Sequence, residues 1–458
     1  MKKILFVIIL FAFTSLNAQY TPLHSFNSGG FTHTLNGLYF DGTYLYGTNK
    51  QGGTNNNGTI FKIKPDGTGF TTIFNFDTQN HDSPIGRLVS DGIYLYGMAT
   101  DFNSGGNGFI YKIKPDGSGF LDIFDFSIVN DGAQPSPSLF FDGTYLYGAT
   151  DLGGLYGDGI IFRIKPDGTS YTTLKDLDES VTGLGVNNLI SDGTYLYGTI
   201  QFGGLNSYGT FFRMKLDGTS FTILLNFDKF TNGSYPSGLI SYGGFLYGTT
   251  VGGGTNNKGT IFKIMSDGSG YQKIFDFNGI NGCWPSASSL LLVGSNFYGT
   301  TSAGGPDDHG TVFKIQNNGT GFVNVFNFLN STNAYIPFGQ IVSDGISIYG
   351  LTAENFDSNN STYGEGDLYK LGLTTGINED LFKLNRVLVY PNPCDGLLNI
   401  SYVNTLKEIE VFDNLGSLVF ITKIDDNDQI NLSSLSKGMY FLRIFTGEQY
   451  HMEKVIVK

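Results

Sequence analysis

The chain is poor in residues that crosslink a fold or bind metal. Its 458 residues include two cysteines, Cys283 and Cys394, five histidines and one tryptophan. Two cysteines in different predicted domains rule out a disulfide framework, so we expect burial and strand pairing to supply the stability. The histidines share neither a repeat position nor the spacing of metal ligands, and we predict no histidine metal site.

Positive charge and long apolar runs are also scarce. Lys and Arg number 27 against 40 Asp and Glu, a formal net charge of −13, which argues against nucleic acid as a partner. Ile4–Phe13 is an apolar run behind Lys2 and Lys3, and it is shorter than the roughly 20 residues of a membrane helix. This pattern is typical of a signal peptide, which we predict over residues 1–18. The rest is expected to be exported, with no transmembrane segment.

Familiar catalytic motifs are missing. The sequence has no Gly-x-Ser-x-Gly nucleophile elbow and no Gly-Lys-Ser/Thr phosphate loop. Carboxylates are frequent in the predicted loops, where two of them could serve glycoside chemistry, but their spacing selects no pair. These carboxylates are Asp82, Asp131, Asp151, Asp158, Asp178, Glu179 and Asp228. We predict no catalytic residue and keep an enzyme as an alternative.

Glycine, in contrast, is abundant and regularly placed. The chain has 65 glycines and repeats variants of Asp-Gly-Thr-Tyr-Leu-Tyr-Gly seven times. The closing residues of this motif, 50 or 51 positions apart, are Gly47, Gly97, Gly148, Gly198, Gly248, Gly299 and Gly350. A fixed period of this length is typical of a repeat architecture.

One repeat predicts four short strands. In the second repeat they are Leu88–Ser90, Tyr94–Gly97, Phe109–Ile113 and Phe120–Phe126. Asp-Gly and Pro-Asp-Gly turns separate the first from the second strand and the third from the fourth, and both suit tight hairpins. No helical apolar period interrupts the pattern. Four strands per repeat predict a β-propeller blade.

The two ends of the repeat region complement each other. Residues 20–27 resemble a fourth strand such as Phe70–Asp77, whereas the seventh repeat stops at Leu371 without one. Pairing these ends would close a ring and remove exposed strand edges. We therefore predict an all-β fold with a seven-bladed β-propeller over residues 19–371, closed by its N-terminal strand.

The predicted strand order places the regular turns on one face and the variable loops on the other, where scaffolds usually carry function. Aromatic side chains in these loops could stack on a sugar or anchor a protein. The alternative is that they pack between blades, since a hydrophobic-Pro pair recurs from repeat to repeat. The candidate ligand-binding residues are Tyr156, Tyr208, Tyr235, Trp284 and Tyr335.

One polar loop raises the question of a cation. Oxygen-bearing side chains alternate there, a pattern that could suit calcium, but Thr362 occupies the place of the glycine expected at the sixth position. We predict no cofactor and leave calcium as an alternative. The residues concerned are Asp357, Asn359, Ser361, Glu365 and Asp367.

The pattern changes after the seventh repeat. Residues 372–385 read as a linker, and residues 386–458 predict a small β-sandwich with alternating strands and short turns. This segment opens with Tyr390-Pro391-Asn392-Pro393 and ends with strands around Gly438–Ile444 and Lys454–Lys458. We expect it to be a separate domain.

Both parts resemble known families. The Asp-Gly-Thr-Tyr-Leu-Tyr-Gly and Lys-Pro-Asp-Gly-Thr-Gly pattern of residues 20–371 is similar to the GloVer-type tandem repeats of exported bacterial proteins. It departs at Tyr242–Phe245 and Val293–Asn296, where the turn aspartate is absent. Residues 387–458 resemble the type A C-terminal sorting domain of the type IX secretion system. That resemblance implies passage through the periplasm and across the outer membrane by the type IX machinery.

These observations lead to one functional hypothesis and two alternatives. We expect a secreted or cell-surface propeller that binds an extracellular glycan or protein without catalysis. One alternative is a glycan-active hydrolase or lyase with carboxylates at the axial mouth. The other is a purely structural surface protein.

Overall fold

A computed structural model shows the chain as a series of β-strands. It describes residues 18–26, 37–77, 82–100, 106–129, 131–285, 290–329, 334–357, 362–373, 388–390, 394, 396–401, 408–412, 418–422, 429–445 and 450–457. These residues form no helix that could cross a membrane. The chain divides into two units, Met1–Leu373 and Thr374–Lys458. The predicted signal peptide and linker lie almost wholly outside the described residues.

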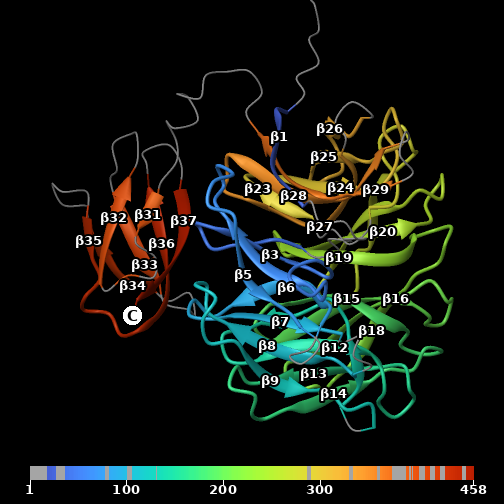
Figure 1. Cartoon of the computed structure of the whole chain (residues 1–458), viewed down its shortest axis with the longest axis horizontal. Coiled ribbons are helices and arrows are strands. Elements are labelled where there is room, and N and C mark those ends of the chain that lie inside the picture. Colours follow the sequence, from blue (N-terminus) through green and yellow to red (C-terminus); the bar gives the residue numbers. More distant parts are fainter. Residues whose placement is uncertain are drawn as a thin grey trace, which may run out of the picture. The chain divides into compact units, whose positions relative to one another are not determined.

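The described residues of the first unit form seven antiparallel sheets, which are numbered in chain order (Figure 1). Sheet 1 comprises β2 (Tyr39–Phe40), β3 (Leu45–Asn49), β4 (Thr59–Ile63) and β5 (Thr71–Asn75). Sheet 2 comprises β6 (Pro84–Ser90), β7 (Leu95–Ala99), β8 (Phe109–Ile113) and β9 (Leu121–Asp125). Sheet 3 comprises β10 (Ala133–Pro135), β11 (Phe140–Phe141), β12 (Leu146–Leu152), β13 (Ile160–Ile164) and β14 (Thr172–Asp176). Sheet 4 comprises β15 (Leu184–Ser191), β16 (Tyr195–Phe202), β17 (Thr210–Lys215) and β18 (Thr222–Asn226).

The remaining sheets of this unit follow the same pattern. Sheet 5 comprises β19 (Ser234–Tyr242), β20 (Phe245–Gly252), β21 (Thr260–Met265) and β22 (Gln272–Asp276). Sheet 6 comprises β23 (Leu291–Val293), β24 (Asn296–Thr301), β25 (Thr311–Gln316) and β26 (Val323–Asn327). Sheet 7 comprises β27 (Tyr335–Ser343), β28 (Ser347–Asp357), β29 (Thr362–Glu365), β30 (Asp367–Gly372) and the N-terminal β1 (Tyr20–Ser25). The all-β prediction is confirmed.

The repeated Asp-Gly turn has a physical reason. Asp41 Oδ1 accepts the N–H groups of Thr43 and Tyr44, both at 2.7 Å, and its Oδ2 accepts the Tyr46 hydroxyl at 2.9 Å. One carboxylate thus fixes both the turn and the strand that follows. Asp91, Asp142, Asp192 and Asp344 make the same three bonds.

The closing glycine of the motif is required by an aromatic ring on the third strand. A Cβ atom on Gly47 would lie 2.4 Å from the Phe61 ring, and one on Gly198 would lie 2.5 Å from the Phe212 ring. Phe61 and Phe212 are completely buried. Close packing of ring on backbone therefore leaves no room for a side chain at this position.

The N-terminal strand closes the ring of sheets, as predicted. Strand β1 pairs antiparallel with β30, from Tyr20 opposite Leu371 to Ser25 opposite Asp367, and Figure 1 shows it in blue beside the orange strands of the last sheet. Sheet 7 also bonds to sheet 1, because the Leu38 N–H donates to the Gln340 carbonyl at 3.2 Å. The first unit is therefore a closed β-propeller.

Side-chain stacking between sheets confirms the place of β1. Rings of neighbouring fourth strands stack with centroids 3.9 Å apart for Phe74 and Phe120, and 4.1 Å apart for Phe275 and Phe322. Strand β1 makes such ring contacts with the neighbouring sheet on each side. Tyr20 stacks on Phe326 of sheet 6 at 5.0 Å, and His24 stacks on Phe70 of sheet 1 at 3.6 Å.

Cations on the third strands add a further link between sheets. Lys62 Nζ donates to the Pro115 carbonyl at 2.9 Å, and Arg163 Nη1 donates to the Leu216 carbonyl at 2.9 Å. Arg213 Nη1 donates in the same way to the Ser266 carbonyl at 3.0 Å. Each acceptor lies in the hairpin turn of the next sheet, so these bonds fix the spacing of neighbouring sheets.

The described residues of the second unit form two sheets. One comprises β31 (Leu388–Tyr390), β32 (Leu397–Ser401) and β35 (Gln429–Asn431), and the other β33 (Glu408–Phe412), β34 (Leu418–Thr422), β36 (Gly438–Phe445) and β37 (Tyr450–Val457). Buried side chains of both sheets, including Leu398, Ile430, Ile409 and Leu442, share one hydrophobic cluster. Cys394 is buried in this cluster, and Cys283 is buried in the first unit; both are free thiols.

Candidate functional site

The first strands of the sheets surround a cavity of about 470 Å³. Sheets 1 to 5 and sheet 7 contribute to its described lining, through residues at or beside their first strands and at the ends of second strands. The first strands are therefore innermost, and the cavity lies on the axis of the ring. Its polar lining residues include Arg87, Thr100, Ser138, Asp151, Asn187, Asn188, Gln201, Ser237 and Gln340.

One position of the repeat supplies a variable residue to the cavity lining. The residue ten positions before the closing glycine differs from repeat to repeat, whereas the next residue is always a buried leucine or isoleucine, from Leu38 to Ile341. Successive residues of a strand point to opposite sides. The buried leucine or isoleucine therefore anchors the strand, and the preceding residue, which lines the cavity, varies among the repeats. The variable residues of the described repeats are Gly37, Arg87, Ser138, Asn188, Gly238 and Gln340.

Hydrogen bonds between neighbouring sheets hold the cavity wall. Asn187 Nδ2 donates to the Pro236 carbonyl at 3.0 Å, and Thr199 Oγ1 donates to the Ser237 carbonyl at 2.6 Å. Ser237 Oγ in turn donates to the Pro285 carbonyl at 3.1 Å. These bonds run from one sheet to the next, so the wall is preorganised before any ligand arrives.

Arg87 is the cation of this lining. Protein surrounds it on nearly every side, yet the cavity leaves its side chain partly accessible. Burial lowers the pKa of Arg87, but a guanidinium remains protonated. Among the described residues, none forms a hydrogen bond or ion pair with Arg87, Gln201 or Gln340 side chains. Three long polar side chains therefore face the cavity with donors available.

Asp151 is the carboxylate of the described lining. Its Oδ1 accepts a hydrogen bond from Ser136 Oγ, and burial raises the pKa of the carboxyl group above its usual range. A second carboxylate close enough for glycoside chemistry is not present in the described lining. The cavity thus combines one cation, one carboxylate and several neutral hydrogen-bonding groups.

The residues of the recurring hydrophobic-Pro pairs have a left-handed backbone conformation before the proline. Tyr235, Trp284 and Ile336 each precede proline and have φ of 58°, 56° and 55°. That conformation is costly for a residue with a Cβ atom. The N–H group of Trp284 donates to the Lys258 carbonyl of the preceding sheet at 3.0 Å, and the other two residues make equivalent bonds. The recurring hydrophobic-Pro pair therefore joins neighbouring sheets.

The structure separates most of the predicted ligand-binding residues. Tyr208 and Tyr235 come together, with ring centroids 6.0 Å apart. Tyr335 is buried and packs on His309, with centroids 4.2 Å apart, which matches the packing alternative. Trp284 and Tyr156, 46% and 56% exposed, belong to the loops of different sheets.

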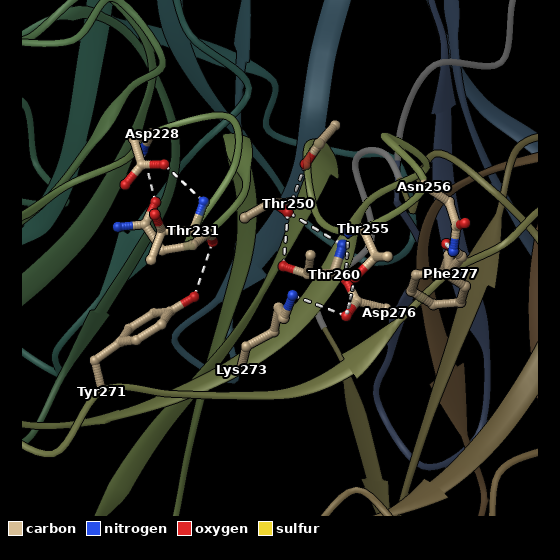
Figure 2. Close-up of polar contacts among 12 residues, drawn as sticks. Asp228, Thr231, Thr250, Thr255, Asn256, Thr260, Tyr271, Lys273, Asp276 and Phe277 are labelled. Carbon is tan, nitrogen blue, oxygen red and sulfur yellow. Dashed lines mark hydrogen bonds and ion pairs between the residues drawn. The ribbon is translucent and has the colours of Figure 1, made fainter.

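Several predicted loop carboxylates accept hydrogen bonds from loop backbone groups. Figure 2 shows Asp228 bonded to the Thr231 N–H at 2.7 Å. It also shows Asp276, a β22 residue that was not among the predicted carboxylates, bonded to the Thr255 N–H at 3.1 Å. Asp178 accepts the Ser180 N–H and hydroxyl in a similar local turn. Asp158 accepts the Glu179 N–H at 2.8 Å. These carboxylates are engaged by backbone groups, which explains their frequency without catalysis.

No three His, Cys, Asp or Glu side chains gather around a possible metal position in the described part of the chain. The calcium hypothesis is not tested by this finding. Asn359 and Ser361 lie outside the described residues, and so do the side chains of Asp357 and Glu365. Asp367, whose pKa is raised by burial, is the described member of that loop.

The axial residues Arg87, Gln201 and Gln340 were not among the candidates predicted from the sequence. Their positions in the repeat are nevertheless distinctive. Gln201 lies three positions after a closing glycine, where other repeats have Thr100, Asp151 and Val251. A position that varies strongly inside otherwise regular strands was a better pointer to the cavity than an aromatic residue in a long loop.

Comparison with known proteins agrees with this architecture. The GH74 enzyme of Niastella koreensis is similar in fold, with 13% identity and a TM-score of 0.53 over 94% of this chain and 74% of that one. An oligogalacturonate lyase of Vibrio parahaemolyticus has 9% identity and a TM-score of 0.52 over 79% of this chain and 95% of that one. The extracellular domain of a hybrid two-component system from B. thetaiotaomicron has 15% identity and a TM-score of 0.50 over 96% and 60%. At these identities the likeness concerns the fold alone.

Sequence families identify both parts of the chain. No curated protein matches it significantly. The model of the secretion system C-terminal sorting domain matches residues 388–458, which establishes export through type IX secretion to the cell surface or the medium. The model of the Gloeobacter/Verrucomicrobia repeat matches residues 9–194 and 185–404. The chain therefore belongs to the Gloeobacter/Verrucomicrobia repeat family and carries a type IX sorting domain at its C-terminal end.

Proposed function

We propose that this exported propeller binds an extracellular ligand, either a glycan or a segment of a protein, without changing it chemically. The observation that carries this proposal is the axial cavity. Its volume of about 470 Å³ falls within the roughly 300–1,000 Å³ of small-ligand sites. Its polar groups are fixed by strands, and they differ from sheet to sheet, so they can match an asymmetric ligand.

The alternative of a glycan hydrolase or lyase has less support. Glycoside hydrolysis commonly uses two carboxyl groups about 5–9.5 Å apart. The described lining supplies Asp151, and other loop carboxylates such as Asp178 and Asp228 are engaged by backbone N–H groups. A binding site needs no such pair, so binding is the simpler function for these residues.

Trp284 is the loop aromatic residue best placed to extend the site. It precedes Pro285, whose carbonyl accepts a hydrogen bond from the cavity residue Ser237. The Lys258 ammonium lies 5.4 Å from the centre of its ring. An exposed ring beside a cation is suited to stacking on a sugar ring that projects from the cavity.

The test is a glycan-array screen of the full exported chain, repeated with two matched variants. Val251→Trp fills the cavity lining, whereas Val323→Trp adds the same ring to an exposed outer-strand position, where Val323 is 48% exposed. We expect the first variant to lose binding and the second to retain it. Binding that survives Val251→Trp unchanged would place the ligand elsewhere, and Trp284→Ala would then show whether the loops carry it.

A further inference from the structure

The strongest unexplained feature of the cavity is the charge of Arg87. A cation that protein largely encloses usually has an anionic partner, because removing it from water is costly, and Arg87 is enclosed in this way although the cavity leaves it partly accessible. Among the described residues Arg87 has no hydrogen-bond or ion-pair partner. The equivalent positions of the other described repeats have Gly37, Ser138, Asn188, Gly238 and Gln340, so the propeller does not need a cation there for its fold.

The surroundings restrict what kind of anion could satisfy this group. A guanidinium binds a planar carboxylate through two parallel hydrogen bonds. Asp151 lines the same cavity and would repel a ligand that carries several negative charges. A described lining with one cation and one carboxylate therefore favours a ligand with a single negative charge over a phosphate ester or a polyanion.

The neutral groups indicate the rest of the ligand. Gln201 and Gln340 bring amides that can both donate and accept, and these suit hydroxyl groups, which also do both. The cavity volume of about 470 Å³ is far larger than a carboxylate alone. A compact molecule with one carboxylate and several hydroxyl groups would fill the space and use both kinds of partner.

We infer that the axial cavity binds a small hydroxylated monocarboxylate, of the chemical class of acidic sugars, through its carboxylate on Arg87. This inference rests on the proposed binding function and specifies its ligand. The formal charge of the chain, −13, does not oppose it, because salt screens surface charges beyond about 8 Å. Arg87 acts on the ligand at direct contact.

Three probes with the same ring and different charge test the inference on the unmodified full chain. They are D-glucuronate, D-glucose and D-glucosamine, with binding measured by ligand-observed NMR titration. We expect glucuronate to bind at least tenfold more tightly than glucose, and glucosamine to bind most weakly. Equal affinity for glucuronate and glucose, a preference for glucosamine, or no binding of glucuronate would each overturn the inference.

Variants then assign the effect to Arg87. Arg87→Gln should weaken glucuronate about 10- to 100-fold, because a hydrogen bond to a charged group is lost, while glucose binding changes little. The affinity of Arg87→Lys for glucuronate should fall between those of the parent and Arg87→Gln, because lysine keeps the charge but cannot form the two parallel hydrogen bonds of a guanidinium. Arg213→Gln removes the same charge from the third strand of sheet 4, outside the described cavity lining, and should bind glucuronate like the parent. Melting curves confirm folding, and an Arg87→Gln variant that is folded and binds glucuronate normally would refute the assignment.

The proposed function and this inference can fail separately. A neutral glycan that binds on the array and is blocked by Val251→Trp would keep the cavity as a binding site and overturn the acidic ligand. Glucuronate binding that survives Val251→Trp would overturn both.

Discussion

Ring closure by β1 makes a quantitative prediction at Phe26, the residue that follows this strand. Phe26 is 5% exposed and packs against Phe61 of sheet 1, with ring centroids 5.0 Å apart. Its N–H donates to the Gly366 carbonyl at 3.2 Å. Deleting a buried phenylalanine side chain costs about 3–5 kcal/mol, and the Phe26→Ala variant should lose that much stability.

Phe227 offers a matched control within an uninterrupted part of the ring. It is completely buried, packs on Phe262 of the next sheet with centroids 5.4 Å apart, and donates its N–H to the Gly209 carbonyl at 2.9 Å. Phe227→Ala should therefore lose a similar amount. If β1 completes the ring as an equal strand, the two losses agree within about 1 kcal/mol.

Urea denaturation, followed by tyrosine fluorescence and far-UV circular dichroism, measures both losses. Hydrogen exchange adds a local readout, since the amides of Tyr20–Ser25 should lose protection in Phe26→Ala and keep it in Phe227→Ala. A loss below about 1 kcal/mol for Phe26→Ala, with the full loss for Phe227→Ala, would show that the N-terminal strand is only loosely attached. The reasoning on ring closure would then be wrong.

Three further predictions follow from the structure. The Tyr197→Phe variant lacks the hydrogen bond to the Asp192 carboxylate, and its free energy of unfolding should fall by about 1.5–3 kcal/mol. Tyr247 lies in a sheet without the turn aspartate, so Tyr247→Phe should lose far less stability. Urea denaturation midpoints of the two variants test this difference. Burial lowers the pKa of His24 below its usual 6.5. The contribution of His24 to stability is therefore complete above pH 6.5, and it declines as the pH falls through the folded pKa. The urea midpoint of the His24→Phe variant should change less between pH 7 and 5 than that of the parent. Removing residues 388–458, the sorting domain, should leave the propeller in the periplasm, and appearance of the truncated chain in the medium would contradict that.

Much of the propeller could be predicted because the same residues make the same local contacts in most repeats. Asp91 occurs at a fixed position because its carboxylate bonds to the turn and to the Tyr96 hydroxyl. Gly97 occurs at a fixed position because the Tyr111 ring leaves no room for a side chain there. Closure was predictable for a related reason. Leu23 of β1 lies against Gly67 of the next sheet, as Ile73 lies against Gly117, so the N-terminal segment keeps the sequence of a fourth strand.

The ligand-binding candidates were harder to predict because exposure depends on neighbours far apart in the chain. Ile336, not Tyr335, is the equivalent of Trp284, because each precedes proline and donates its N–H to the preceding sheet. Tyr335 is equivalent to Cys283, and both are buried, whereas Trp284 is 46% exposed. Tyr335 packs on His309 of the preceding sheet, and a single repeat contains no information about that partner.

The cavity shows how a tandem repeat can acquire specificity without losing its fold. Residues that recur, such as the buried leucines of the first strands, fix the ring, and substitution there removes packing from two sheets at once. The preceding residue lines the cavity and varies among the described repeats, although Gly37 itself has little room, since a Cβ atom there would lie 2.9 Å from the Gln340 Cβ. Arg87 and Gln340 occupy this position where Gly37 and Gly238 suffice elsewhere. Their presence is therefore better explained by what enters the cavity than by the stability of the propeller.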